Sequence, residues 1–326
     1  MKKPSLPGLL VLAATLSACA TVPESGPAIA PGIHTGQITE GGDSLRYRLF
    51  VPERSAGDPA PPLLMLLHGC TQDAQDVARG TRMDEVAAEH GVAVLYPEQA
   101  EGAHPLRCWN WYLPEHQRRG SGEPHQLVSL AEHAAARIGT APDRFYVAGI
   151  SAGGAAALTL AASYPDRVVA AAVHSALPYG IARDQDEGLA LMAEGPDLPA
   201  AELAARVLEA MGEHARPVPL MMLHGRDDPV VHRGNGAAVL EQWAEVHAAL
   251  TDGASVLATR TEMHGGRAVE ITSASHGEGT RLDLWMVDGL GHAWSGGSPE
   301  GSYTDPAGPD ASREILRFLV SHGGGR

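Results

Sequence analysis

The sequence predicts an α/β protein with a mostly parallel central sheet, helices on both faces and an N-terminal antiparallel hairpin. Short apolar runs alternate with helical segments along most of the chain, as in parallel strands joined by crossover helices. Several runs, such as 63–67, are apolar without interruption, which is typical of strands buried on both faces. Near the start, two β-forming runs at 33–38 and 45–51 flank a Gly-Gly turn and predict the hairpin.

The remaining elements follow from the same pattern. Expected strands are 63–67, 92–96, 145–148, 168–173, 220–223 and 282–287, and expected helices are 75–90, 125–138, 155–162, 242–250 and 311–319. Segment 179–211 contains breakers such as Gly195-Pro196 and interrupts the alternation. We expect it to be an insertion over the carboxyl edge of the sheet, where a lid would lie. No repeat period is visible, and residues 33–323 are expected to form a single domain.

Composition excludes some classes of function. The chain has 326 residues and a net charge of −15, with its Lys and Arg residues scattered along the sequence. Binding to a phosphate backbone requires a concentrated basic surface, so we expect no nucleic-acid partner and favour a neutral or weakly polar substrate. The 16 histidines include no spacing typical of a zinc site, so no metal is expected.

The N-terminus has the pattern of a targeting segment. Lys2 and Lys3 precede an apolar stretch at 9–16 that is too short to span a bilayer. The stretch ends in Leu-Ser-Ala-Cys at 16–19, which resembles the lipobox of bacterial lipoproteins, where the cysteine is lipidated. We therefore expect a signal peptide at 1–18, lipidation of Cys19 and a flexible tether at 19–32. A plain secretory signal cleaved nearby is the alternative, and both imply export to the cell envelope or beyond.

Two cysteines remain if Cys19 carries lipid. Cys70 and Cys108 are an even pair in an oxidising compartment, which favours a disulfide between them. On the chain-entropy account, closing this loop would stabilise the fold by about 3–4 kcal/mol. Two buried free thiols are the competing interpretation.

The most informative segment is 145–154, Phe-Tyr-Val-Ala-Gly-Ile-Ser-Ala-Gly-Gly. A short β-forming run enters a G-x-S-x-G pattern, and a strong helix former follows it. Strand, sharp turn and helix are the context of a nucleophile elbow, in which glycines allow the turn and the serine is exposed at its tip. Ser151 is therefore the candidate nucleophile. The alternative is a glycine-rich turn of purely structural importance, in which the serine has no catalytic role.

A serine hydroxyl needs a base and an orienting acid, which follow the nucleophile elbow in the order acid, then histidine. The apolar run 220–223 leads into an H-G-x-x-D-x-x-V turn, whose acid is Asp228. Asp227 also satisfies D-x-x-V and is the rival. The last strand leads into a glycine-containing loop with His292, the proposed base. His264 and His276 lie in polar segments with no expected strand immediately before them and are interpreted as surface or packing residues.

Two further features complete the expected site. The run 63–67 leads into His-Gly-Cys-Thr-Gln at 68–72. In enzymes with a nucleophile elbow, this loop supplies one of the backbone N–H groups that bind the oxyanion. We expect Cys70 to be this donor, with Thr71 as the second choice. The amide of Ala152 is expected to be the second donor. Aromatic residues gather in a loop at 107–112, which suggests a substrate-binding wall that includes Trp109 and Trp111, with Trp294 on the opposite side. Packing in the core is the alternative for each tryptophan.

Several motifs together resemble the polyhydroxybutyrate (PHB) depolymerase-type esterases, a group related to feruloyl and acetylxylan esterases. The matching segments are 68–72, 107–111, 149–154, 291–297 and the tail Ser-Tyr-Thr-Asp-Pro at 302–306. The resemblance covers residues 33–322 and implies an α/β-hydrolase fold, a Ser151–Asp228–His292 triad and hydrolysis of carboxylic esters. Depolymerases that attack solid polymer usually carry an extra binding domain, for which residues 33–326 leave no room. Soluble oligomers, or hydroxycinnamoyl and acetyl esters of sugars, are therefore at least as plausible as a polymer granule.

The resulting hypothesis is a cell-envelope serine esterase that forms an acyl-enzyme, which water then hydrolyses without a metal or other cofactor. The expected substrate is a small ester or oligoester, and the oligomeric state is left open. A serine peptidase on the same fold is one rival, and a lipid-anchored protein that has lost the chemistry is another. Relative turnover of ester and amide bonds, and labelling by a fluorophosphonate, separate these alternatives.

Overall fold

The computed structural model describes residue 1 and residues 29–323, apart from 41, 56, 252, 254, 255 and 277–279. The expected signal peptide and Cys19 lie outside the described residues. Within these ranges the chain forms a ten-stranded sheet of order β1-β2-β4-β3-β5-β6-β7-β10-β9-β8. Its strands are β1 (Gly32–Glu40), β2 (Asp43–Val51), β3 (Leu63–Leu67), β4 (Ala93–Pro97), β5 (Phe145–Ile150), β6 (Val168–His174), β7 (Leu220–Gly225), β8 (Val256–His264), β9 (Arg267–His276) and β10 (Thr280–Val287).

The centre of the sheet is parallel and its two edges are antiparallel. Strands β4, β3, β5, β6, β7 and β10 pair in parallel, as the alternating pattern predicts. The expected hairpin β1–β2 adds antiparallel strands at one edge, with Glu40 opposite Asp43 at its turn. The carboxyl ends of the parallel strands therefore share one edge of the sheet, where α/β proteins place their sites.

A second hairpin, β8–β9, closes the other edge and is not predicted from the sequence. Residues 256–263 of β8 are all exposed, so the strand has no buried face to impose an alternating pattern. His264 ends β8 and His276 ends β9, so the expectation that no strand precedes these histidines is wrong.

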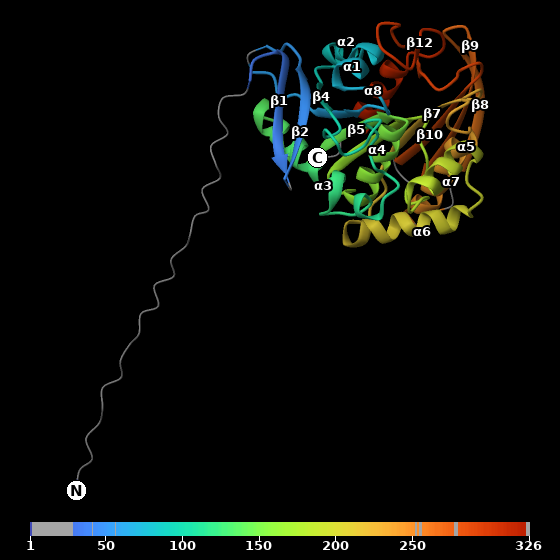
Figure 1. The fold of residues 1–326 in the computed structure, drawn as a ribbon, viewed down its shortest axis with the longest axis horizontal. Helices are drawn as coiled ribbons and strands as arrows, with labels where there is room; N and C mark the ends of the chain where they lie inside the picture. The colour runs from blue at the N-terminus through green and yellow to red at the C-terminus, as the bar shows by residue number, and fades with distance from the viewer. Residues whose placement is uncertain are drawn as a thin grey trace.

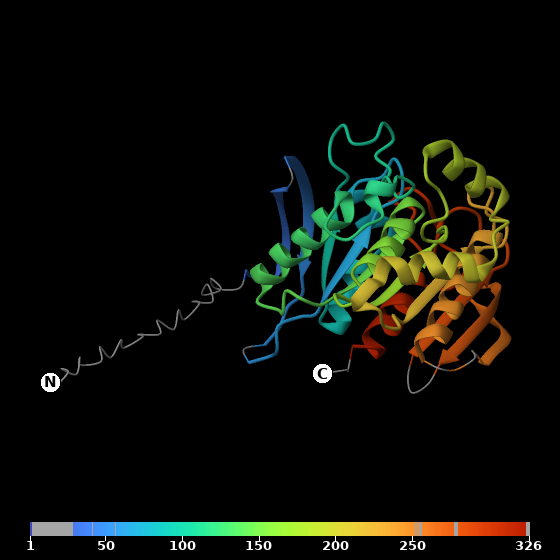
Figure 2. The ribbon, with the colours of Figure 1, turned by 90° about the horizontal axis from the view of Figure 1, so that it is seen from below.

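Helices cover both faces of the sheet. They are α1 (Ala74–Thr81), α2 (Met83–His90), α3 (Gly122–Ile138), α4 (Ala152–Ser163), α5 (Gln185–Glu194), α6 (Ala200–Met211), α7 (Gly234–Thr251) and α8 (Ala311–Ser321). In Figure 1, α1, α2 and α8 lie above the sheet and α3, α4, α6 and α7 lie below it; Figure 2 shows the same arrangement from below. The architecture is therefore that of an α/β-hydrolase, with β11 (Trp294–Ser295) and β12 (Thr304–Asp305) as a small added pair.

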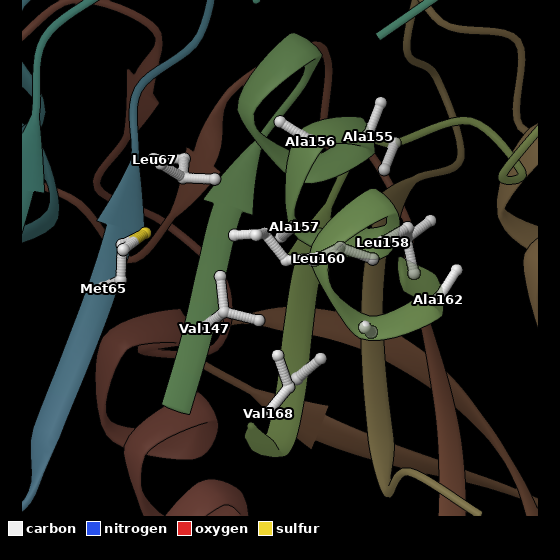
Figure 3. Close-up of a cluster of buried hydrophobic side chains, with 14 of the residues drawn as sticks. Met65, Leu67, Val147, Ala155, Ala156, Ala157, Leu158, Leu160, Ala162 and Val168 are labelled. Carbon is white, nitrogen blue, oxygen red and sulfur yellow. The ribbon is translucent and has the colours of Figure 1, made fainter. Parts of the chain in front are cut away.

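Strand residues alternate between two hydrophobic clusters. In β3, Leu63, Met65 and Leu67 belong to the cluster under α3, α4, α6 and α7, whereas Leu64 and Leu66 belong to the cluster under α1, α2 and α8. Burying such a side chain stabilises the fold by about 1.5–3 kcal/mol. Figure 3 shows part of the first cluster, in which Ala157 and Leu160 of α4 lie on the side of the helix toward Val147. Every residue of α4 is buried, and its small side chains allow the helix to lie close to the sheet.

Two expectations for the helices need correction. The expected helix 75–90 is broken at Arg82, which has a left-handed φ of 53° and separates α1 from α2. Arginine is a good helix former, so the composition of the segment gives no sign of this break. Segment 179–211 was expected to lie over the carboxyl edge, but its second helix, α6, packs against α4 and α7 beneath the sheet. Of the two helices in this segment, α5 lines the site described below and α6 does not.

Candidate active site

Ser151 lies at a strained turn between β5 and α4. Its backbone has φ 57° and ψ −124°, a conformation that costs a non-glycine residue about 1–3 kcal/mol. A Cβ atom on Gly149 would lie 2.3 Å from the carbonyl oxygen of Gly153, and one on Gly153 would lie 2.3 Å from the carbonyl oxygen of Leu67. Both glycines are thus required by close backbone approach. The Ser151 amide donates to His174 O at 2.9 Å, which ties the turn to the neighbouring strand β6.

His292 and Asp228 form a directly hydrogen-bonded pair. His292 lies in the loop after β10, Asp228 lies in the turn after β7, and Nδ1 of the ring is 2.8 Å from Asp228 Oδ2. The other oxygen of Asp228 accepts the amides of Val230 at 2.9 Å and Val231 at 2.8 Å. Burial raises the pKa of Asp228, but its hydrogen bond and charge interaction with His292 and the two amides lower it to about 2. The acid is therefore an ionised, fully buried group that orients the imidazole.

Asp227, the rival acid, has a different partner. Its Oδ2 accepts the amide of Gly289 at 3.1 Å and so connects the turn after β7 with the loop that carries His292. No bond joins it to the ring of His292, although both residues are described. The geometry thus gives the two neighbouring carboxylates separate roles.

Ser151 and His292 face one cavity of about 250 Å³ at the carboxyl edge of the sheet. Both side chains are described, and no direct hydrogen bond joins Ser151 Oγ to the ring. Such bonds are often long in unliganded enzymes and shorten when substrate binds. The structure therefore joins His292 to Asp228 by a hydrogen bond, and Ser151 and His292 line the same cavity.

The wall of this cavity is mostly apolar. It is formed by the loop after β3, the loop 104–112, one side of α5, and by Val230 and Tyr303. No Lys or Arg is among the described residues that line it. The cavity therefore suits a neutral group and offers no countercharge to a carboxylate. Leu189 and Met192 of α5, which the sequence interpretation did not single out, contribute to this wall.

The loop after β3 leaves one amide free toward the site. The Thr71 amide donates to Leu106 O at 2.6 Å, so the fallback oxyanion donor is already occupied. Gly69 N donates to the Gln72 side chain at 2.9 Å. The amides of Cys70 and of Ala152, the first residue of α4, have no acceptor within the described part of the chain. An oxyanion on the Ser151 side of the cavity would find its donors in these two groups.

The loop 104–112 is fixed by a disulfide and by a buried acid. Cys70 and Cys108 are joined in a disulfide, as expected, which ties this loop to the loop after β3. Glu123 accepts hydrogen bonds from Gln99 Nε2 at 2.6 Å, Asn110 N at 2.8 Å and Asn110 Nδ2 at 2.7 Å. Burial raises the pKa of Glu123, whereas His116 and these donors lower it in part. No sequence pattern indicates this role for Glu123, because its three bonds join segments that are distant along the chain.

The three tryptophans do not share one role. Trp111 lines the cavity, with its ring against Gly188 of α5. Trp109 is fully buried and donates to His68 O at 3.1 Å, and Trp294 is buried against His174 and donates to Ser312 Oγ at 3.1 Å. The expectation that Trp109 and Trp294 form a binding wall is therefore wrong. Each indole N–H finds an acceptor in the interior, which stabilises its position there.

Two more histidines lie behind His292. His174 is fully buried, and desolvation, followed by the nearby His224 and His292, lowers its pKa to about 3. Burial also lowers the pKa of His224, whose Nε2 is 2.9 Å from Val231 O. Both rings are therefore neutral near pH 7 and add no positive charge beside the imidazole of His292. Within the described residues, no group of three or more His, Cys, Asp or Glu side chains is placed to hold a metal ion.

Comparisons with known proteins show the family to which the chain belongs. A sequence profile of the family described as esterase PHB depolymerase matches residues 45–264, more than half of the chain. The chain is 28% identical to poly(3-hydroxyalkanoate) depolymerase C of Paucimonas lemoignei over 73% of its own length and 56% of that protein's. It is also 28% identical to feruloyl esterase B of Thermothelomyces thermophilus, over 78% and 87% of the two chains.

A solved structure shows the same fold. Acetyl xylan esterase from Aspergillus awamori superposes with a TM-score of 0.62 at 20% identity, over 79% of this chain and 94% of the other. The chain thus spans little more than half of the depolymerase but most of the feruloyl and acetyl xylan esterases. On the strength of the profile match, the chain belongs to the esterase PHB depolymerase family of carboxylic ester hydrolases.

Proposed function

We propose that this protein hydrolyses carboxylic esters with Ser151 as nucleophile, His292 as general base and Asp228 as the acid that orients it. The observation that supports this most strongly is the Asp228–His292 pair at 2.8 Å, which faces the same cavity as the serine at the strained turn. A neutral imidazole held in one orientation by a carboxylate is what a serine hydroxyl requires for activation.

The reaction follows from this arrangement. Ser151 Oγ attacks the ester carbonyl carbon while its proton passes to Nε2 of His292. The carbonyl oxygen becomes an oxyanion that accepts hydrogen bonds from the amides of Cys70 and Ala152. When the intermediate collapses, His292 gives the proton to the departing alcohol and an acyl-serine remains. Water, deprotonated by the same imidazole, then releases the acid and restores Ser151.

The shape and polarity of the cavity support a neutral, compact substrate. A volume of about 250 Å³ accommodates a short acyl chain or a single aromatic acyl group. Short-chain esters and hydroxyalkanoate oligomers fit this description. Feruloyl or acetyl esters of carbohydrates are a second candidate, favoured by the relatives named feruloyl esterase B and acetylxylan esterase A.

One panel of substrates tests the proposal. Wild type and Ser151→Ala are compared on p-nitrophenyl esters, hydroxybutyrate oligomers, methyl ferulate and acetylated xylan, with fluorophosphonate labelling in parallel. We expect wild type to hydrolyse at least one class and to be labelled, and the variant to lose both properties. Full activity in Ser151→Ala would show that the nucleophile is elsewhere.

We also propose that the catalytic domain, residues 33–323, is exported and attached to a membrane through lipid on Cys19. The basic residues at 2–3, the apolar stretch 9–16 and the lipobox-like 16–19 support this, and so does a disulfide that requires an oxidising compartment. None of the helices in the described ranges has the length and hydrophobicity of a bilayer span. Metabolic labelling with radioactive palmitate should mark wild type but not Cys19→Ala, and equal labelling would refute the anchor.

A further inference from the structure

Tyr303 lies at the mouth of the cavity, in the tail motif for which the sequence suggested no role. Tyr303 lines the cavity, and the residue as a whole is 45% exposed. The ring meets the imidazole of His292 edge to face, with 6.2 Å between the centroids. Tyr303 is thus an aromatic side chain that contacts the proposed base and also faces solvent.

The backbone holds this tyrosine firmly in place. Tyr303 has a left-handed φ of 51°, a strained conformation for a residue with a large side chain. Its carbonyl oxygen accepts Trp294 N at 2.7 Å, and the preceding Ser302 O accepts Gln72 Nε2 at 3.1 Å. Because Gln72 also binds Gly69 N, the tail is joined to the loop that carries the Cys70 amide. Such strain persists only where surrounding contacts fix it, and it concentrates at functional sites.

The hydroxyl of Tyr303 has a polar neighbour. Its oxygen is 3.2 Å from Oγ1 of Thr71, the residue after the proposed oxyanion donor Cys70. Each of the two hydroxyls can take part in more than one hydrogen bond, so the pair retains capacity for a ligand at the exposed mouth. An aromatic face beside two hydroxyls complements a ring that has an apolar face and hydroxyl groups.

The chemistry of the reaction shows which half of the ester would lie here. The departing alcohol oxygen must receive its proton from His292, so the alcohol has to lie on the His292 side of Ser151. Tyr303 is in contact with that ring. The part of the cavity that Trp111 and α5 line together is then left for the acyl group.

We propose that Tyr303 and Thr71 form the subsite for the alcohol half of the ester, and that this alcohol is a sugar. The ring of the sugar lies on the face of Tyr303, and one of its free hydroxyls binds the Tyr303–Thr71 pair. This inference rests on the proposed esterase function and adds the alcohol class to it. No Lys or Arg lines the described cavity, and Arg107, which lies beside the subsite, already donates to Thr71 O at 2.8 Å.

The first experiment uses two esters with the same acyl group. Tyr303→Ala should lower kcat/KM for an acetylated methyl xyloside by about tenfold more than for ethyl acetate, the size expected for losing an aromatic contact and a hydrogen bond to the sugar. Tyr303→Phe and Thr71→Val should each show a smaller selective loss. Tyr112→Phe is the matched control, because it removes a hydroxyl from the part of the cavity assigned to the acyl group. Any change that it causes in kcat/KM should be the same for both acetates.

A second measurement follows the acyl-enzyme itself. Every acetate gives the same acetyl-serine, so kcat for p-nitrophenyl acetate, where deacylation limits the rate, measures what Tyr303→Ala does through His292 alone. Methyl xyloside added as an acceptor should capture about tenfold less acetyl group from the variant than from wild type, because transfer to the sugar is the reverse of acylation.

Equal losses on both acetates, matched by an equal fall in the rate of deacylation, would overturn the subsite and show that Tyr303 acts through His292. Failure of the esterase proposal would look different. In that case wild type would not react with a fluorophosphonate, or Ser151→Ala would keep its activity on every ester tested.

Discussion

Asp227 and Asp228 are adjacent residues of the same type, yet only Asp228 contacts the imidazole of His292. Asp228→Asn keeps the shape of the side chain but removes its charge, and its amide can present an N–H to the ring. We expect kcat to fall by about 10³-fold to 10⁴-fold, as when a triad acid is neutralised. Because the pKa of Asp228 is about 2, the loss should have the same size at every pH above about 4.

Asp227→Asn is the matched control for that prediction. Its amide oxygen can still accept the Gly289 amide, so the loop that carries His292 keeps its support. We expect kcat within about threefold of wild type, since a neutral acceptor replaces an exposed charged one. Burst kinetics with p-nitrophenyl acetate give kcat for both variants. A larger loss in Asp227→Asn than in Asp228→Asn would reverse the assignment of the acid.

At the scale of residues, the sequence predicts what local backbone geometry dictates. The glycines around Ser151 are required by contacts within a few residues or with the next strand, so the motif predicts the turn. The direction of a loop side chain depends instead on distant partners. Trp109 and Trp294 were expected in a wall, but acceptors at His68 and Ser312 hold them in the core. The motif at 302–306 predicts no role for Tyr303, because the neighbours of this side chain come from two other loops.

At the scale of elements, the loop 104–112 is held by one covalent and several polar contacts. Replacing both Cys70 and Cys108 by serine removes the cross-link between positions 38 residues apart. We expect the free energy of unfolding to fall by about 3–4 kcal/mol, because the unfolded chain gains conformational freedom. The bonds of Glu123 to Asn110 persist, so the folded variant should retain the loop.

Denaturant unfolding with and without a reductant checks this prediction. Reduced wild type should match the double variant, and the variant itself should not respond to reductant. If unfolding of wild type is equally insensitive, the two cysteines are not joined in solution, contrary to the structure.

The contact between α5 and Trp111 limits the depth of the cavity. A Cβ atom on Gly188 would lie 3.2 Å from Trp111 Cη2 and 3.3 Å from Tyr112 Cβ. Gly188→Ala should therefore push the ring into the acyl part of the cavity and lower kcat/KM for p-nitrophenyl butyrate about tenfold more than for p-nitrophenyl acetate.

The unfolding midpoint of Gly188→Ala serves as its control. Alanine favours a helix over glycine by about 1 kcal/mol, so stability should not drop much despite the close contact. Equal effects on the two esters would show that α5 does not border the acyl group.

The elements of the sheet centre are predictable, because strands buried on both faces have continuous apolar sequences. The hairpin β8–β9 is not, since β8 is almost entirely exposed and gives no periodic signal. The position of α6 beneath the sheet is likewise set by its packing on α4 and α7, which the breakers around it do not reveal. Sequence pattern thus identifies elements through burial, and it fails where burial is absent or arises from distant contacts.

At the scale of the whole molecule, the fold buries several histidines as neutral rings. Burial lowers the pKa of His68, His174 and His224, and for His174 to about 3, whereas an unfolded chain has an imidazole pKa of about 6.5. Between these two values the unfolded state binds protons that the folded state does not. Stability therefore rises with pH across this range and falls as the pH is lowered from about 6.5 toward 3.

For His174 alone, the expected loss is about 1.4 kcal/mol for each pH unit below about 6.5, down to its folded pKa near 3. Urea unfolding at several pH values gives the slope. His174→Asn and His174→Gln should each reduce that slope by about 1.4 kcal/mol per pH unit, the contribution of one proton, whatever they do to stability at pH 7. An unaltered slope in both His174 variants would mean that this ring takes up a proton in the folded protein as readily as in the unfolded chain, so that its burial beside His224 and His292 is not maintained in solution.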